Sequence, residues 1–305
     1  MFTRDNLFTW PPAVFFWALV CALLWGSAFP MVKIGMVMLD IQHSTSGKLY
    51  FAAYRFFLAG LMIFAGLAVM GKPIRLTCRH DYGVMLLTGL LQTTLQYIFF
   101  YIGLSNTTGV KASIIIGSGS FFLALFSHLW FKDDPITLRK STGLVVGFLG
   151  IILVNLQGNS LDFQVTLTGE GFILLTALSS TLALVVVKKA AVRMDPPLMS
   201  AYQLVFGAVV LYVVAMVFGP PSVLVFSAPS LVVLFYLSFL SAAAFSLWYL
   251  LIRHNRLSSM AVYRFLIPVC AALLSVALLE SEHLSWAALA ALVLVSLGIV
   301  LTSRE

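Results

Sequence analysis

Charged residues are scarce in this sequence. Aspartate, glutamate, lysine and arginine together make up 10% of its 305 residues, whereas a soluble domain carries about 25%. Hydrophobic residues fill the gap and reach 61%. A chain with this balance cannot cover its surface with polar side chains, so the composition excludes an ordinary soluble domain and favours a membrane protein.

Cysteines and catalytic motifs are also sparse. The three cysteines, Cys21, Cys78 and Cys270, have neither paired nor metal-ligand spacing, so we predict no disulfide and no metal site. The sequence contains no His-Glu-x-x-His motif, no nucleophile elbow and no phosphate-binding loop. We therefore predict that the protein is not an enzyme and uses no cofactor.

Acidic residues are missing from the middle of the apolar stretches. All carboxylates fall in loops or near the ends of these stretches, Glu170 among them. Ion-coupled carriers usually place a carboxylate at mid-depth, so this absence argues against a simple carboxylate-coupled pump. It leaves a facilitator, an exchanger, or coupling through Glu170 or His128. Because Lys33, Arg55 and Arg264 lie within the stretches, neutral, zwitterionic or anionic cargo is favoured over cationic cargo.

Long apolar stretches are what the sequence has in abundance. About 20 residues of helix cross the ~30 Å hydrocarbon core of a bilayer, and spans of this length must be helical because lipid offers no hydrogen bonds to the backbone. We therefore predict an all-α polytopic membrane protein with ten transmembrane helices. They cover residues 14–36, 47–70, 82–104, 109–131, 139–156, 169–188, 198–218, 230–252, 259–279 and 284–302.

Lysines and arginines gather on one side of this layout. Thirteen of the eighteen fall in segments on the side of the N-terminus, and two fall on the opposite side. Such a bias marks the cytoplasmic face, so we predict a multi-pass protein of the bacterial inner membrane with both termini in the cytoplasm. Topology thereby accounts for the formal net charge of +7, and we predict no nucleic-acid partner.

The two halves of the chain resemble each other weakly. Leu149–Val154 resembles Leu297–Thr302, and Tyr54 matches Tyr202, both at an offset of 148 residues. We therefore divide the chain into 1–158 and 159–305, with five helices each. An odd number of spans inverts the second half relative to the first, as in transporters that alternate access to a midplane site. A duplicated inert bundle is the alternative.

Three short motifs resemble a known family. Residues 25–33 read Trp-Gly-Ser-Ala-Phe-Pro-Met-Val-Lys, residues 54–60 read Tyr-Arg-Phe-Phe-Leu-Ala-Gly, and residues 268–284 begin with Pro-Val-Cys-Ala and end on Glu-Ser-Glu-His-Leu. Together they resemble the ten-helix, EamA-type branch of the drug/metabolite transporter (DMT) superfamily, over essentially the whole chain. The resemblance implies transport of a small molecule without specifying which one. The span at 109–131 departs from the family pattern, since it has glycines and serines where a proline is usual.

Helix interruptions at matched positions of two halves are a sign of a transport site. Pro268 removes a backbone donor, and Gly117 and Gly119 lie at the corresponding level of the first half. We predict helix breaks or gating at these three residues. Arg264 lies some five residues into its span, roughly 8 Å deep. It either binds a carboxylate or phosphate with both terminal nitrogens or extends to the cytoplasmic surface.

The other candidates are aromatic and polar residues within the spans. Packing against lipid or bonding to a neighbouring helix is the alternative role for each of them. Near the outer ends of the first two spans, Lys33 and Arg55 are expected to be structural or outer-gate charges. The predicted substrate-binding residues are Trp25, Gln96, Tyr97, Ser118, Ser180, Tyr202, Trp248 and Arg264.

Taken as a whole, the sequence predicts a secondary transporter for small organic metabolites. Amino acids, aromatic ones among them, are the expected cargo, and export is the expected direction. The expected partners are a small-molecule substrate and the lipid bilayer, and we expect a monomer or homodimer. Two alternatives are a broad efflux transporter for drugs or nucleoside-like compounds, and a non-transporting membrane sensor or assembly subunit.

Overall fold

The computed structural model describes residues 7–107, 109–155, 166–221, 224–278 and 286–303. Within these ranges the chain is helical and contains no strand, which confirms the predicted all-α class. The helices are α1 (Pro11–Met38), α2 (Thr45–Val69), α3 (Arg79–Gly89), η2 (Leu90–Leu95), α4 (Gln96–Ser105), α5 (Gly109–Trp130), α6 (Leu138–Asn155), η3 (Leu167–Gly171), α7 (Phe172–Ala190), α8 (Pro196–Phe218), α9 (Ala228–His254), α10 (Leu257–Tyr263), α11 (Leu266–Leu278) and α12 (Trp286–Ser303).

Six of the helical stretches are long and apolar enough to cross a membrane. They are Pro11–Met38, Thr45–Val69, Arg79–Ser105, Leu167–Ala190, Pro196–Phe218 and Ala228–His254. Shorter apolar helices lie at Ile115–Trp130, Leu257–Ala271 and Val293–Thr302. The structure thus supports a polytopic membrane protein, while the ten-span layout in two inverted halves stays a prediction.

Local sequence signals explain where several helices begin. Prolines open α1 and α8, because the first turn of a helix has no use for the missing N–H and the ring presets φ. At the start of α9, Ser227 and Ser230 cap each other's backbone N–H groups in a capping box. These signals set the residues at which α1, α8 and α9 begin.

Small residues bring helices from distant parts of the sequence close together. A methyl group built on Gly89 would lie 2.7 Å from the carbonyl oxygen of Gln203, so α3 and α8 touch backbone to backbone there. Likewise, one on Gly298 would lie 2.6 Å from the carbonyl oxygen of Gly143, where α12 packs along α6. The Gly143 and Gly147 pair therefore serves close helix packing. Further packed pairs are α2 with α8, α1 with α9 and α11, and α5 with α7.

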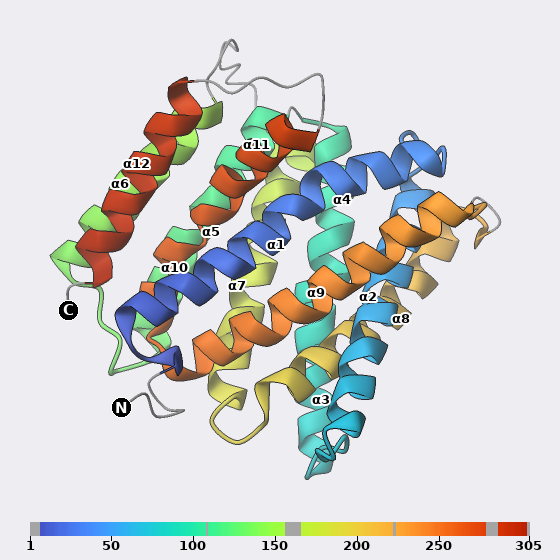
Figure 1. Cartoon of the computed structure of the whole chain (residues 1–305), viewed down its shortest axis with the longest axis horizontal. Coiled ribbons are helices and arrows are strands. Elements are labelled where there is room, and N and C mark those ends of the chain that lie inside the picture. The colour runs from blue at the N-terminus through green and yellow to red at the C-terminus, as the bar shows by residue number, and fades with distance from the viewer. Residues whose placement is uncertain (1–6, 108, 156–165, 222–223, 279–285, 304–305) are drawn as a thin grey trace.

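The start of α1 and the end of α12 lie at the same end of the molecule (Figure 1). The loops that join α2 to α3, α5 to α6 and α7 to α8 reach this end as well. We call it the basic end, because these loops and the adjoining helix turns carry residues such as Lys72, Lys132 and Arg193. The grouping agrees with the uneven charge distribution seen in the sequence.

Candidate functional site

The helical path between residues 257 and 278 is broken at Arg264 and Phe265. Helix α10 ends at Tyr263, and α11 begins at Leu266. The ring of a proline clashes with the carbonyl group four residues earlier, which for Pro268 is that of Arg264. Shorter bonds replace the helical pattern here, since the N–H groups of Phe265 and Ile267 donate to residues three positions back, each at 3.1 Å. Pro268 thereby explains why the break falls at the arginine.

The half-buried side chain of Arg264 extends toward α7. Its Nη1 atom is buried without a hydrogen-bond partner, and its Nη2 atom lies 3.5 Å from the Ser180 hydroxyl of α7, which is long for a hydrogen bond. Arg264 is seven residues from the start of α10, about 10 Å into the helix. A cation at this depth with an unused donor is a candidate anion-binding group.

The Arg264 side chain faces the place where α5 and α7 pack against each other. Helix α5 is continuous through Gly117 and Gly119, so the break expected there is absent. Gly119 faces α7 and Arg264: a methyl group on it would lie in ordinary contact, 3.4 Å from Ala177 and 3.7 Å from the Nη2 atom of Arg264. The Thr181 hydroxyl donates to the Ala177 carbonyl of its own helix at 2.8 Å and also lies 3.2 Å from the Gly119 carbonyl, so α5 and α7 are in contact here.

Three of the predicted residues belong to a cluster of aromatic side chains. Trp25 contacts Trp248 edge to face, with ring centroids 5.5 Å apart, and also contacts Phe245 at 5.4 Å. The ring of Phe245 lies 6.4 Å from Phe56, which in turn contacts Tyr97 at 4.7 Å. We call these five residues the aromatic ladder. Sequence reasoning missed Phe56 and Phe245, because nothing distinguishes them from the other 23 phenylalanines.

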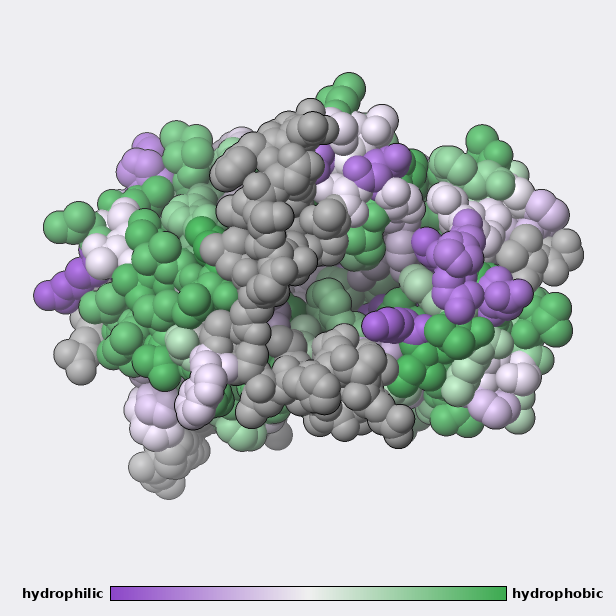
Figure 2. Space-filling model, turned by 90° about the horizontal axis from the view of Figure 1, so that it is seen from above, coloured by the Kyte–Doolittle hydropathy of each residue, from purple (hydrophilic) through white to green (hydrophobic). Residues whose placement is uncertain are grey.

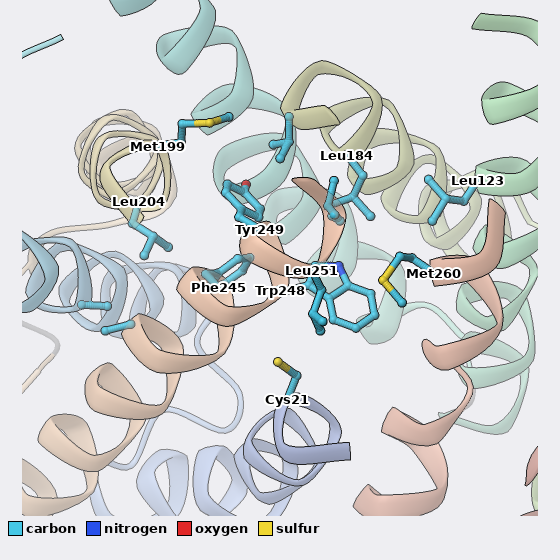
Figure 3. Close-up of a cluster of buried hydrophobic side chains, with 14 of the residues drawn as sticks. Cys21, Leu123, Leu184, Met199, Leu204, Phe245, Trp248, Tyr249, Leu251 and Met260 are labelled. Atoms are coloured by element: carbon cyan, nitrogen blue, oxygen red, sulfur yellow. The ribbon is translucent and has the colours of Figure 1, made fainter. Parts of the chain in front are cut away.

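The two ends of the aromatic ladder meet different elements. At one end, Trp248 belongs to the same buried cluster as Met260 of α10 (Figure 3), and Met260 lies four residues before Arg264. Near the other end, the guanidinium carbon of Arg55 stands 4.9 Å above the Phe56 ring, within cation–π distance. The ladder therefore links α9 and α1 to the middle of α2.

Arg55 lies deeper than the sequence suggested. It is ten residues inside α2, about 15 Å from the start of that helix, and its side chain is 6% exposed. Its Nε atom donates to the Ser241 hydroxyl at 2.9 Å. Lys33 is exposed near the end of α1, and the structural or outer-gate role expected for both charges stays a prediction.

A π-helical turn, η2, interrupts the third long stretch next to Tyr97. Such a turn departs from the α-helical bonding pattern, and the Ser179 hydroxyl of α7 donates to its Leu91 carbonyl at 2.7 Å. The Thr176 hydroxyl donates to the Phe172 carbonyl of its own helix at 3.0 Å and also lies 3.4 Å from the Gln96 carbonyl of α4. The Gln96 side chain accepts a hydrogen bond from Gln92 at 2.8 Å. No proline or glycine within Leu90–Leu95 signals this turn in the sequence.

Two predicted substrate-binding residues do not join this arrangement. Tyr202 donates its hydroxyl proton to the Ile74 carbonyl near the basic end, at 2.9 Å, and packs against Phe64 and Tyr82. Ser118 donates to the Ile115 carbonyl of its own helix at 2.6 Å. Trp25, Tyr97, Trp248, Ser180 and Arg264 are therefore the predicted residues that the structure gathers near the break and the ladder, with Gln96 adjacent to Tyr97.

Open space lies at both ends of the bundle. Seen from the end opposite the basic end, the surface is hollowed near its centre, with hydrophobic side chains visible at depth (Figure 2). A cavity of about 310 Å³ at the basic end is lined by residues of α1, α10 and α12, and reaches Val262 and Tyr263 just before the break. Space for a small molecule thus approaches the broken helix.

Comparisons with known proteins identify the family. The model of the EamA-like transporter family matches residues 13–156 and again residues 167–304. The chain belongs to the EamA-like transporter family. This membership confirms the resemblance to the DMT superfamily drawn from the short motifs.

Relatives of this EamA-like protein occur in several kingdoms. An uncharacterized transporter of Archaeoglobus fulgidus is 28% identical and aligns with 93% of this chain and 94% of its own length. The uncharacterized transporter YvbV of Bacillus subtilis is 27% identical, over 93% and 89% of the two chains. A chloroplastic WAT1-related protein of Arabidopsis thaliana is 25% identical, over 82% and 60%.

One crystal structure has the same fold, with a TM-score of 0.79 over 96% of both chains at 16% identity. The archaeal and Bacillus relatives are named as transporters, which agrees with the prediction that this family member moves a small molecule across a lipid bilayer.

Proposed function

We propose that this EamA-like protein is a secondary transporter of amino acids that works by alternating access, in the export direction, in a bacterial inner membrane. In this proposal ten spans form two inverted halves, 1–158 and 159–305, and both termini face the cytoplasm. The cargo site lies between Arg264 and the aromatic ladder. The observation that carries the proposal is the buried Nη1 atom of Arg264, which has no partner.

The chemistry of the site favours a carboxylate. Burial of an uncompensated charge is costly, and a carboxylate can accept from both terminal nitrogens of one guanidinium. Ser180 and Arg264 would hold the carboxylate of the amino acid, and the rings of Trp25 and Trp248 would contact its apolar part. Neutral drugs would leave the Nη1 atom unpaired, so the aromatic ladder alone supports the alternative of broad drug or nucleoside-like efflux.

Counterflow in liposomes tests this function. Purified protein is reconstituted and the exchange of radiolabelled amino acids is compared for wild type, Arg264→Ala and Arg264→Lys. Arg253→Ala is the matched control, since Arg253 is an exposed arginine at the end of α9. We expect saturable exchange that Arg264→Ala reduces at least about tenfold, because a hydrogen bond to a charged group contributes ~1.5–3 kcal/mol.

Arg264→Lys should retain part of the exchange, because it keeps the charge and loses the two-nitrogen geometry. Exchange that survives in Arg264→Ala would disprove the role of Arg264. If folded wild-type protein exchanges no amino acid above empty liposomes, the amino-acid proposal is wrong and drug-like cargo is next. Everted vesicles that accumulate the cargo, against right-side-out vesicles that do not, would support export.

A further inference from the structure

We propose that Arg55 is a second anion-binding residue, and that the preferred cargo therefore carries two acidic groups, as a dicarboxylate or an acidic amino acid does. This inference rests on the proposed transport function and narrows its substrate class. Its starting point is the position of Arg55, at mid-length of α2 and on the same aromatic ladder that leads to Arg264.

The guanidinium of Arg55 has donors that no protein group among the described residues accepts. Its Nε atom is occupied by Ser241, whose own proton is donated to the Leu237 carbonyl at 2.7 Å. Ser241 thus fixes one edge of the guanidinium, and Phe56 supports one face of it. Within the described residues, the Nη1 and Nη2 atoms donate to no protein group. An arginine held at Nε with its terminal nitrogens available is arranged to bind a planar anion.

Neither buried arginine has a carboxylate partner among the described residues. Ion pairs in the described part of the chain include those of Lys140 with Asp134 and Arg193 with Asp81, both toward the basic end. Two uncompensated cations within a membrane-spanning bundle are costly. A monocarboxylate or a simple zwitterionic amino acid supplies one carboxylate, which can meet one arginine. A cargo with two acidic groups can meet both.

The aromatic ladder sets the shape of such a cargo. Its rings connect Phe56, beneath Arg55, to Trp248 of α9, which shares a buried cluster with Met260, four residues before Arg264 (Figure 3). In the proposed site these apolar rings lie between the two guanidinium groups. A molecule with an acidic group at each end and a carbon chain between them matches this arrangement, because its chain can pack on the rings while each end meets an arginine.

The test compares one-acid and two-acid cargo in the reconstituted full-length protein. Counterflow of labelled glutamate and succinate is measured beside that of leucine and alanine for wild type, Arg55→Gln, Arg55→Lys and the control Arg253→Gln. We expect wild type to prefer the two-acid compounds. Arg55→Gln should lower their exchange about tenfold or more and leave leucine and alanine within about twofold, since one charged hydrogen-bonding site is lost. Arg55→Lys should restore part of the preference.

A second variant covers the case in which Arg55→Gln does not fold. Ser241→Ala keeps both charges and frees only the Nε atom, so it should shift the preference in the same direction by a smaller factor. Protection against heat by glutamate over leucine, measured on detergent-purified protein, gives a binding readout that is independent of transport. This protection should disappear in Arg55→Gln.

Three results would overturn the inference: no preference of wild type for two-acid cargo, an equal loss for all cargo in Arg55→Gln, or no change in that variant. These outcomes differ from a failure of the proposed function. If leucine exchanges and depends on Arg264 while glutamate and succinate gain nothing from Arg55, amino-acid transport stands and the second anion site does not. If no compound exchanges, the transport proposal itself has failed.

Discussion

Asp134 joins three separate elements at the basic end. Its carboxylate accepts hydrogen bonds from Ser127 of α5, from Ser258 of α10 and from the Lys140 ammonium of α6. The backbone N–H of Ser258 adds a bond of 2.9 Å. Burial alone would raise the pKa of this loop carboxyl, but the surrounding donors outweigh it and hold the pKa below its ordinary value.

We expect Asp134→Asn to destabilise the protein by about 3–5 kcal/mol, because it removes the charge partner of the fully buried Lys140. Thermal unfolding of detergent-purified protein measures this. Asp133→Asn is the matched control, since Asp133 is exposed and adjacent, and it should change little. Adding Lys140→Met to Asp134→Asn should recover part of the loss; a double variant as unstable as the single one would contradict the ion-pair explanation.

The same carboxylate predicts a pH dependence. Because its folded pKa is depressed, its contribution is complete above the unfolded pKa of about 3.9 and is lost as pH falls through the lower folded value. The difference in melting temperature between wild type and Asp134→Asn should therefore persist from pH 8 to pH 5 and shrink only in stronger acid. A difference that is already gone at pH 6 would be inconsistent with a depressed pKa.

Single residues show how far sequence reasoning reaches. Arg264 stood out because a cation inside an apolar stretch is costly wherever it lies. Tyr202 lies elsewhere because a ring at the right depth can face any neighbour, and the hydroxyl finds the Ile74 carbonyl. For Arg55 the sequence gives the length of its span but not the partner of its side chain, which in the structure is Ser241.

At the scale of elements, the break between α10 and α11 carries a testable consequence. If Pro268 causes it, Pro268→Ala should let the helix continue through residues 264 and 265 and turn the arginine away from Ser180. We expect a folded protein with exchange activity reduced about tenfold or more. Counterflow measures activity, and amide hydrogen exchange of residues 264–268 should slow as the two additional helical bonds form.

Pro229→Ala is the control for this experiment, because Pro229 sits in the first turn of α9, where a proline costs no helical bond. It should leave both activity and hydrogen exchange near wild-type values. Unchanged protection at residues 264–268 in Pro268→Ala would mean that contacts other than the proline hold the break open.

The sequence predicts helices where apolar composition requires them. It does not predict where a helix departs from the regular α-helical hydrogen-bonding pattern. Apolar stretches long enough to span lipid were visible in the sequence, and helices cover them. The π-turn at Leu90–Leu95 was not, because the partner of its Leu91 carbonyl, Ser179, comes from α7, 88 residues away. Conversely, Gly117 and Gly119 signalled a break, and α5 is continuous through both, since glycine permits either outcome.

At the scale of the whole molecule, polar contacts join distant segments at the basic end. Asn255 donates to the Phe8 carbonyl at 2.8 Å, and Arg193 pairs with Asp81. The Asp134 contacts with Ser258 lie at the same end. Each bond joins residues below 158 to residues above 159, so any opening of this end between the two proposed halves would have to break all of them.

The three native cysteines make the orientation of the bundle measurable. Cys78 is exposed in the loop before α3, at the basic end, while Cys21 and Cys270 are buried. With the basic end in the cytoplasm, a membrane-impermeant maleimide should label the protein in everted vesicles and leave intact spheroplasts unlabelled. Cys78→Ser should abolish the labelling, because the buried thiols stay out of reach. Labelling of intact spheroplasts that Cys78→Ser removes would place the basic end outside and reverse the proposed topology, whereas labelling that persists in Cys78→Ser would show that a helix of the bundle opens to solvent.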